Sequence, residues 1–77
     1  MKKWFFVIDG SSYEGKNADE VIFEMWQSAF YVDATIEEYR RNFVRRLLIY
    51  QGIVVRSANN KELFDDLVVL QLLVEKV

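Results

Sequence analysis

The sequence predicts a small α+β domain with the element order ββααβα. Three features predict it: an aromatic and β-branched run at the N-terminus, apolar periods of three and four residues further along, and three helix-capping patterns. We expect a three-stranded sheet, or a four-stranded one if residues 72–77 form a closing strand, with three helices packed on it. The 77 residues form one compact domain, 1–77, near the lower size limit for unaided folding.

The first two strands are expected at residues 3–8 and 12–14. Residues 3–8 carry apolar side chains at both parities, which is typical of a strand that is central in a sheet or covered on both faces. Asp9-Gly10 favours a hairpin turn because these residues tolerate positive φ. Gly15 is placed to end the second strand.

Each of the three helices begins at a cap residue that is followed three positions later by glutamate. The pairs are Asn17 and Glu20, Thr35 and Glu38, and Asn59 and Glu62. The helices are therefore expected to span about 18–30, about 36–50 with Gly52 as the stop, and from about 60 onward. A third strand is expected at 53–56, between the second and third helices.

Two helices carry more apolar surface than a small sheet can cover. The apolar stripe of the first helix spans about half of its circumference, and the third helix is apolar on nearly every side. Because a helix that is apolar all round must be surrounded, we expect a homo-oligomer, with a homodimer as the first interpretation. The interface is expected to include Phe23, Tyr31, Leu70 and Leu73.

The chain contains no cysteine and no histidine, which removes the usual nucleophile–base pairs and the thiolate and imidazole metal ligands. Adjacent acids such as Asp65-Asp66 point about 100° apart on a helix and do not converge. The three glycines sit at turns and form no phosphate-binding loop. We therefore predict a non-enzymatic protein without metal or cofactor; a carboxylate-based hydrolase is the weakest alternative.

No segment of the sequence predicts a membrane span or a signal peptide. The N-terminal apolar run covers five residues and ends at Asp9, and the run 67–74 is too short to cross a bilayer. A cytoplasmic protein is expected. Small cofactor-free chains occur as accessory or regulatory factors, including those of phages and mobile elements, which is an association with size alone.

All five arginines lie within 17 consecutive residues: Arg40, Arg41, Arg45, Arg46 and Arg56. Residues 39–61 contain these arginines, Lys61 and no acid, for a net charge of +6. Residues 1–38 have eight acids against three lysines, and residues 62–77 have four acids against one lysine. The near-neutral total of −2 therefore conceals an acid–base–acid layout, which concentrates anions at the basic block.

The arginine cluster has two interpretations. It is a solvated helix face neutralised by local pairs such as Glu37 with Arg41, or it is a recognition surface, since nothing nearby in sequence neutralises Arg45 and Arg46. Arg40 lies at the edge of the apolar face of its helix.

As a recognition surface, the five arginines would bind an acidic protein. Nucleic acid is the alternative partner, and it is second because the pI is about 5.0. In self-association, the arginines of one copy would meet either Asp65 and Asp66 or Glu20 and Glu24 of another.

Overall fold

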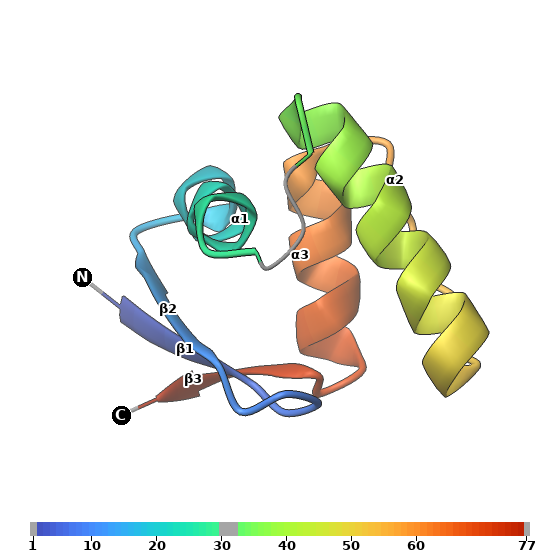
Figure 1. The fold of residues 1–77 in the computed structure, drawn as a ribbon. Helices are drawn as coiled ribbons and strands as arrows, with labels where there is room; N and C mark the ends of the chain where they lie inside the picture. Colours follow the sequence, from blue (N-terminus) through green and yellow to red (C-terminus); the bar gives the residue numbers. More distant parts are fainter. Residues whose placement is uncertain (1, 30–32, 77) are drawn as a thin grey trace.

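The computed structural model describes residues 2–29 and 33–76. Within these ranges, a three-stranded antiparallel sheet and three α-helices form an α+β fold, which confirms the predicted class (Figure 1). A π-helical turn continues the second helix. The elements are β1 (Lys2–Phe6), β2 (Ser12–Gly15), α1 (Ala18–Gln27), α2 (Ile36–Arg46), η1 (Leu47–Gln51), α3 (Asn60–Val69) and β3 (Leu73–Lys76).

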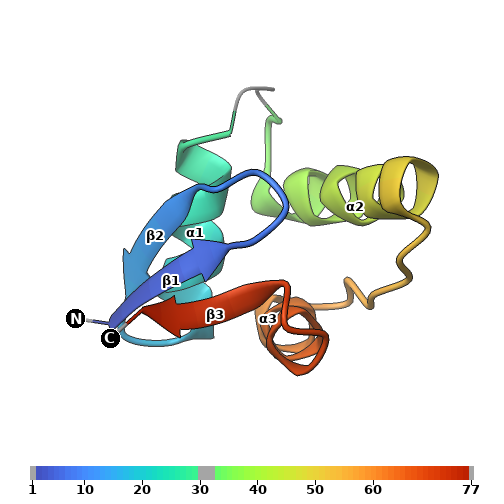
Figure 2. The same ribbon diagram turned by 90° about the horizontal axis from the view of Figure 1, so that it is seen from below.

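The sheet has the order β2-β1-β3, so β1 is central and the other two strands are edges. Trp4 pairs with Tyr13 of β2 and with Glu75 of β3. Helices α1 and α3 cover one face of the sheet, and no helix of the described residues covers the other (Figures 1 and 2). The first strand, β1, is therefore central in the sheet, as expected, but helices cover only one of its faces among the described residues.

Exposed charges bridge the central strand and both edge strands. Lys3 of β1 lies 3.7 Å from Glu14 of β2, and Lys2 lies 3.8 Å from Glu75 of β3. These pairs stand at the end of the sheet where β1 begins.

The expected strand at residues 53–56 is not a strand; the segment connects η1 to α3. Its side chains do alternate, since Val55 is buried and Val54 is 76% exposed. The alternation therefore reports packing against the helices, without a strand partner. The third strand of the sheet is β3, which pairs with β1. Just before β3 begins, the Leu72 carbonyl accepts a hydrogen bond from the Val7 N–H group. The closing strand proposed as an alternative is thus present.

All three predicted helix caps are formed. The side chains of Asn17, Thr35 and Asn59 accept hydrogen bonds from backbone N–H groups three residues later, at 3.0, 3.1 and 2.8 Å. The Glu38 carboxylate accepts in return from the Ala34 N–H group. Gly52 ends η1 in the left-handed conformation with φ of 67°, as its position predicts.

The core lies where α1, α3 and the sheet meet. Its six most deeply buried large side chains are Val21, Ile22, Met25, Leu63, Leu67 and Leu73. The face of α3 away from this core is exposed at Val69 and Leu70. Helix α3 is therefore only partly surrounded within one copy of the chain.

The inner face of α2 joins the core through aromatic rings. Tyr39 and Phe43 are buried, and the Phe43 ring centre lies 5.6 Å from that of Phe6 on β1. Burial raises the pKa of Tyr39, because the phenolate is the form that loses hydration in the core. Folding therefore favours the protonated form of Tyr39.

A Tyr39→Phe variant should be less sensitive to alkali than the wild type. The pKa of Tyr39 is higher in the folded state than the value of about 10 in the unfolded chain. Its contribution to stability is therefore complete below pH of about 10 and is lost as the pH rises further. Denaturant unfolding between neutral and strongly alkaline pH measures the difference.

Tyr50→Phe is the matched control, because Tyr50 is exposed and its replacement should leave the alkaline loss of stability unchanged. Some pH dependence should persist in the Tyr39→Phe variant, since burial also raises the pKa of Tyr13. Identical pH profiles for the Tyr39→Phe variant and the wild type would contradict the prediction.

Candidate functional site

The structure divides the five clustered arginines into three groups. Arg40 is only 8% exposed. Its Nε donates to the Ser57 carbonyl at 3.3 Å, and its Nη1 donates to Oδ1 of Asn60. Asn60 in turn donates to the Asp19 carboxylate at 3.1 Å. Arg40 therefore links α2 to the start of α3 and, through Asn60, to α1, and it is withdrawn from the expected binding surface.

Arg56 is held by acids of α3. Its Nη2 lies 2.8 Å from Asp66 Oδ1, its Nη1 lies 3.4 Å from Glu62, and its backbone N–H donates to Asp66. These contacts fix the 53–56 segment along α3. The guanidinium of Arg56 is therefore already matched with carboxylates of its own chain.

Arg41 and Arg45 remain exposed on the outer side of α2, opposite Tyr39 and Phe43. The local pairs expected to neutralise them are not formed: among the described residues, no carboxylate lies within 4.0 Å of either guanidinium. Arg46 is half-buried and lines a groove with Tyr39. The interpretation as a solvated helix face therefore stands without these local ion pairs.

Large apolar side chains follow the two exposed arginines along the same helix. Leu48 is 52% exposed and Ile49 is 64% exposed, both on η1. We call Arg41, Arg45, Leu48 and Ile49 the arginine–apolar face. The π-helical turn and the stop at Gly52 position its apolar end.

The four residues expected at an oligomer interface have different environments. Phe23 and Leu70 are about half exposed, at 49% and 48%. Leu73 lies on the inner side of β3, and its side chain is fully buried in the core together with residues of α3. It is therefore removed from the expected oligomer interface. Tyr31 lies outside the described residues.

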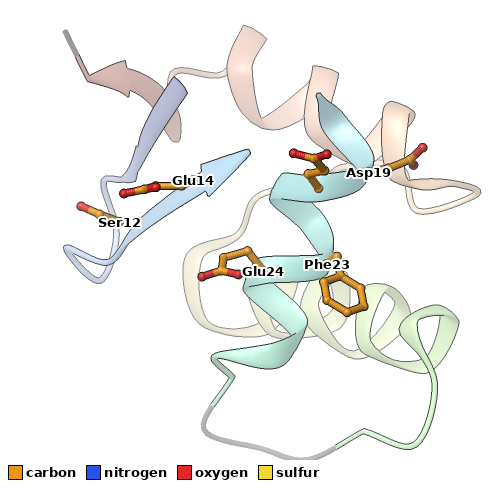
Figure 3. Close-up of a pocket in the computed structure, with 6 residues that line it drawn as sticks. Ser12, Glu14, Asp19, Phe23 and Glu24 are labelled. Carbon is orange, nitrogen blue, oxygen red and sulfur yellow. The ribbon is translucent and has the colours of Figure 1, made fainter. Parts of the chain in front are cut away.

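An acidic hollow of about 770 Å³ lies between β2 and α1 (Figure 3). It is lined by Ser12, Glu14, Asp19, Glu20, Phe23 and Glu24, and no arginine is among these residues. The Phe23 ring packs edge-on against Trp26 with centroids 5.7 Å apart. No cluster of three or more acids close enough to hold a metal ion occurs in the described part of the chain.

Sequence reasoning identified Phe23 but did not assemble this hollow. Glu14 and Ser12 come from β2, and only the packing of β2 against α1 brings them beside the helix acids. The signal that was present is local: Glu20, Phe23 and Glu24 fall on one side of α1 at helical spacing.

A second, narrower groove of about 370 Å³ lies between the β1–β2 turn and the α2–η1 helix. Its lining is mainly apolar and includes Phe6, Ile8, Tyr13, Tyr39 and Tyr50, with Arg46 and Asp9 as charged members. Because these two side chains carry opposite charges, the groove does not favour either an anionic or a cationic ligand.

The comparisons with known proteins give no relative: no protein family, no curated protein and no solved structure matches the chain at a significant level. No helix among residues 2–29 and 33–76 has the length and apolar character needed to span a bilayer.

Replacing Arg40 should destabilise the fold, whereas replacing Arg41 should not. Arg40→Met keeps much of the side-chain volume but leaves the Ser57 carbonyl and Asn60 Oδ1 without their donors. The expected loss is about 1–3 kcal/mol in the free energy of unfolding. Arg41→Met, on the exposed side of the same helix, should change it by less than about 0.5 kcal/mol. Equal midpoints of chemical denaturation for the two variants would contradict this assignment.

Asp66→Asn should weaken the acid dependence of stability. The hydrogen bonds from Arg56 lower the pKa of Asp66 in the folded state. The stabilisation is therefore present above the ordinary pKa of about 3.9 and is lost as the pH falls further, so the variant should show a shallower loss in acid. Thermal unfolding between neutral pH and strong acid measures this.

Asp65→Asn is the matched control, because the ion pair that Asp65 forms among the described residues is with the exposed Lys61 and not with Arg56. An acid profile of Asp66→Asn that coincides with the wild-type profile would show that the Arg56 contact does not stabilise the fold.

Proposed function

We propose that this chain is a small non-enzymatic protein that acts through protein–protein contact, with the arginine–apolar face as its binding surface for acidic protein. The observation that carries the proposal is the exposure of Arg41 and Arg45 without a carboxylate partner among the described residues, next to the exposed Leu48 and Ile49. Homo-oligomerisation and a regulatory or accessory role belong to the same proposal.

The chemistry of this face supports a protein partner. Protein interfaces are enriched in arginine, methionine and aromatic side chains, and an apolar centre is surrounded by a polar rim. Two like charges four residues apart on a helix repel each other by a few tenths of a kcal/mol. Carboxylates of a partner would offset that repulsion and accept bidentate hydrogen bonds from each guanidinium.

Nucleic-acid binding remains the alternative and has less support. It relied on five arginines acting together, but Arg40 is buried and Arg56 is matched with Asp66 and Glu62. A surface with two uncompensated arginines would give a weak salt dependence, because that dependence scales with the number of phosphates neutralised.

Charge reversal of the arginine–apolar face should abolish binding to acidic protein. The probe is a fluorescent, glutamate-rich helical peptide unrelated in sequence to this chain, titrated at low salt. The Arg41→Glu/Arg45→Glu variant should bind it at least about tenfold more weakly than the wild type, since opposite charges become like charges across the contact.

Lys61→Glu/Lys76→Glu is the matched control, because it changes the net charge equally at exposed positions that are not part of α2. Labelled duplex and single-stranded nucleic acid are titrated in parallel. Peptide binding that survives the α2 reversal, or tight binding of nucleic acid alone, would overturn the proposed function.

A further inference from the structure

The same spacing of side chains occurs on the arginine–apolar face and on the wall of the acidic hollow. On α2, Arg41 and Arg45 are four residues apart with Val44 between them. On α1, Glu20 and Glu24 are four residues apart with Phe23 in the corresponding place. Side chains at this spacing are about 5–6 Å apart along a helix, so the two charge pairs match in length.

We propose that the arginine–apolar face of one copy docks in the acidic hollow of a second copy, so that the protein assembles head to tail. This inference rests on the proposed function, because it names the acidic partner of the same face. The inference is based on the exposure of the arginine–apolar face. Because the charges of this face and of the acidic hollow are complementary, we take the molecule that docks in the hollow to be another copy of this chain.

The structure decides between the two acid pairs that self-association could use. Asp66 is already bound by Arg56 at 2.8 Å, and Asp65 is bound by Lys61 at 3.0 Å. In contrast, no described hydrogen bond or ion pair involves the Glu24 carboxylate, which lines the hollow in Figure 3. The carboxylates of Glu20 and Asp19 each accept one hydrogen bond, and both donors are neutral groups. The negative field available to a partner therefore lies at the hollow.

Apolar groups on both sides complete the match. Phe23 stands half-exposed on the wall of the hollow and offers a ring for an arginine of the partner. Leu48 and Ile49 can cover the remaining exposed surface of Phe23. Aromatic side chains and arginine are enriched at interfaces, and the residues that contribute most to binding cluster near the interface centre.

The two surfaces are carried by different elements of the fold. In both ribbon views, β2 and α1 stand on one side and α2 on the other (Figures 1 and 2). A copy therefore cannot bring its own arginines to its own hollow. Because the two contacting surfaces differ, the contact is heterologous, and it extends into a chain or closes into a ring. The homodimer expected from the sequence would need the face of each copy to meet the hollow of the other copy at the same time.

Two variants test this arrangement by blocking opposite ends of the assembly. The face variant, Arg41→Glu/Arg45→Glu, keeps an intact hollow. The hollow variant, Phe23→Ser/Glu24→Gln, keeps an intact face and leaves the capping carboxylate of Glu20 in place. Circular dichroism and thermal unfolding establish that both are folded, and sedimentation velocity measures their mass.

The wild type should form species larger than a dimer as its concentration rises at low salt, and should dissociate at high salt. Each variant alone should remain monomeric. An equimolar mixture should yield a 1:1 dimer and nothing larger, since one intact face meets one intact hollow and both outer ends are blocked. The Lys61→Glu/Lys76→Glu protein is the control and should assemble like the wild type.

Several outcomes would overturn the inference. A wild type that stays monomeric at every concentration would exclude a second copy as the partner. Assembly lost in the face variant but kept in the hollow variant would place the acceptor elsewhere. In both cases the proposed binding of acidic protein survives if the face still binds the acidic peptide. If charge reversal of Arg41 and Arg45 leaves both peptide binding and assembly unchanged, both proposals are wrong.

Discussion

The position of α2 depends on Arg40, a charged side chain that folding removes from water. A buried guanidinium is tolerated only when its donors are matched, and here the Ser57 carbonyl and Asn60 provide acceptors from the segment that begins α3. Asn60 passes the connection to Asp19 on α1. This series of hydrogen bonds thus joins all three helices, in addition to the aromatic contact of Phe43 with Phe6. Because these hydrogen bonds fix the rotation of α2 about its own axis, they also fix the direction in which Arg41 and Arg45 point.

The same helix shows how packing and exposure are divided along one element. Its inner residues, Tyr39 and Phe43, are buried, while Leu48 and Ile49 on η1 remain in solvent although they are as apolar as core residues. π-Helical turns are rare and are often found at functional sites. The uncovered apolar end of this helix is therefore the feature on which the proposed protein–protein contact depends most.

Local features were predictable from the sequence, and long-range ones were not. The caps at Asn17, Thr35 and Asn59 depend on contacts within three residues, so spacing alone identified them. Periodicity placed Arg40 at the edge of an apolar face but could not reveal its acceptors, which lie 17 and 20 residues away. The alternation at 53–56 predicted a strand because alternation reports burial of every second side chain, and burial against helices produces the same pattern.

The candidate site followed the same division. Exposure of Arg41 and Arg45 follows from helical periodicity, whereas the pairing of Arg56 with Asp66 depends on how the 53–56 segment crosses α3. The acidic hollow needs β2 and α1 together, so the sequence indicated only its helical half. Leu73 was misplaced for a similar reason, since a terminal apolar run does not reveal which of its residues faces the core.

The two edge strands of the sheet have a consequence for aggregation. Free strand edges are templates for pairing with other chains, and both β2 and β3 offer such an edge. The pairs Lys3 with Glu14 and Lys2 with Glu75 are exposed, so they contribute little to the stability of the fold. Their charges instead make it costly for a foreign strand to add to the sheet, which protects a very short sheet from fibrillar aggregation while the helical surfaces remain open to specific contact.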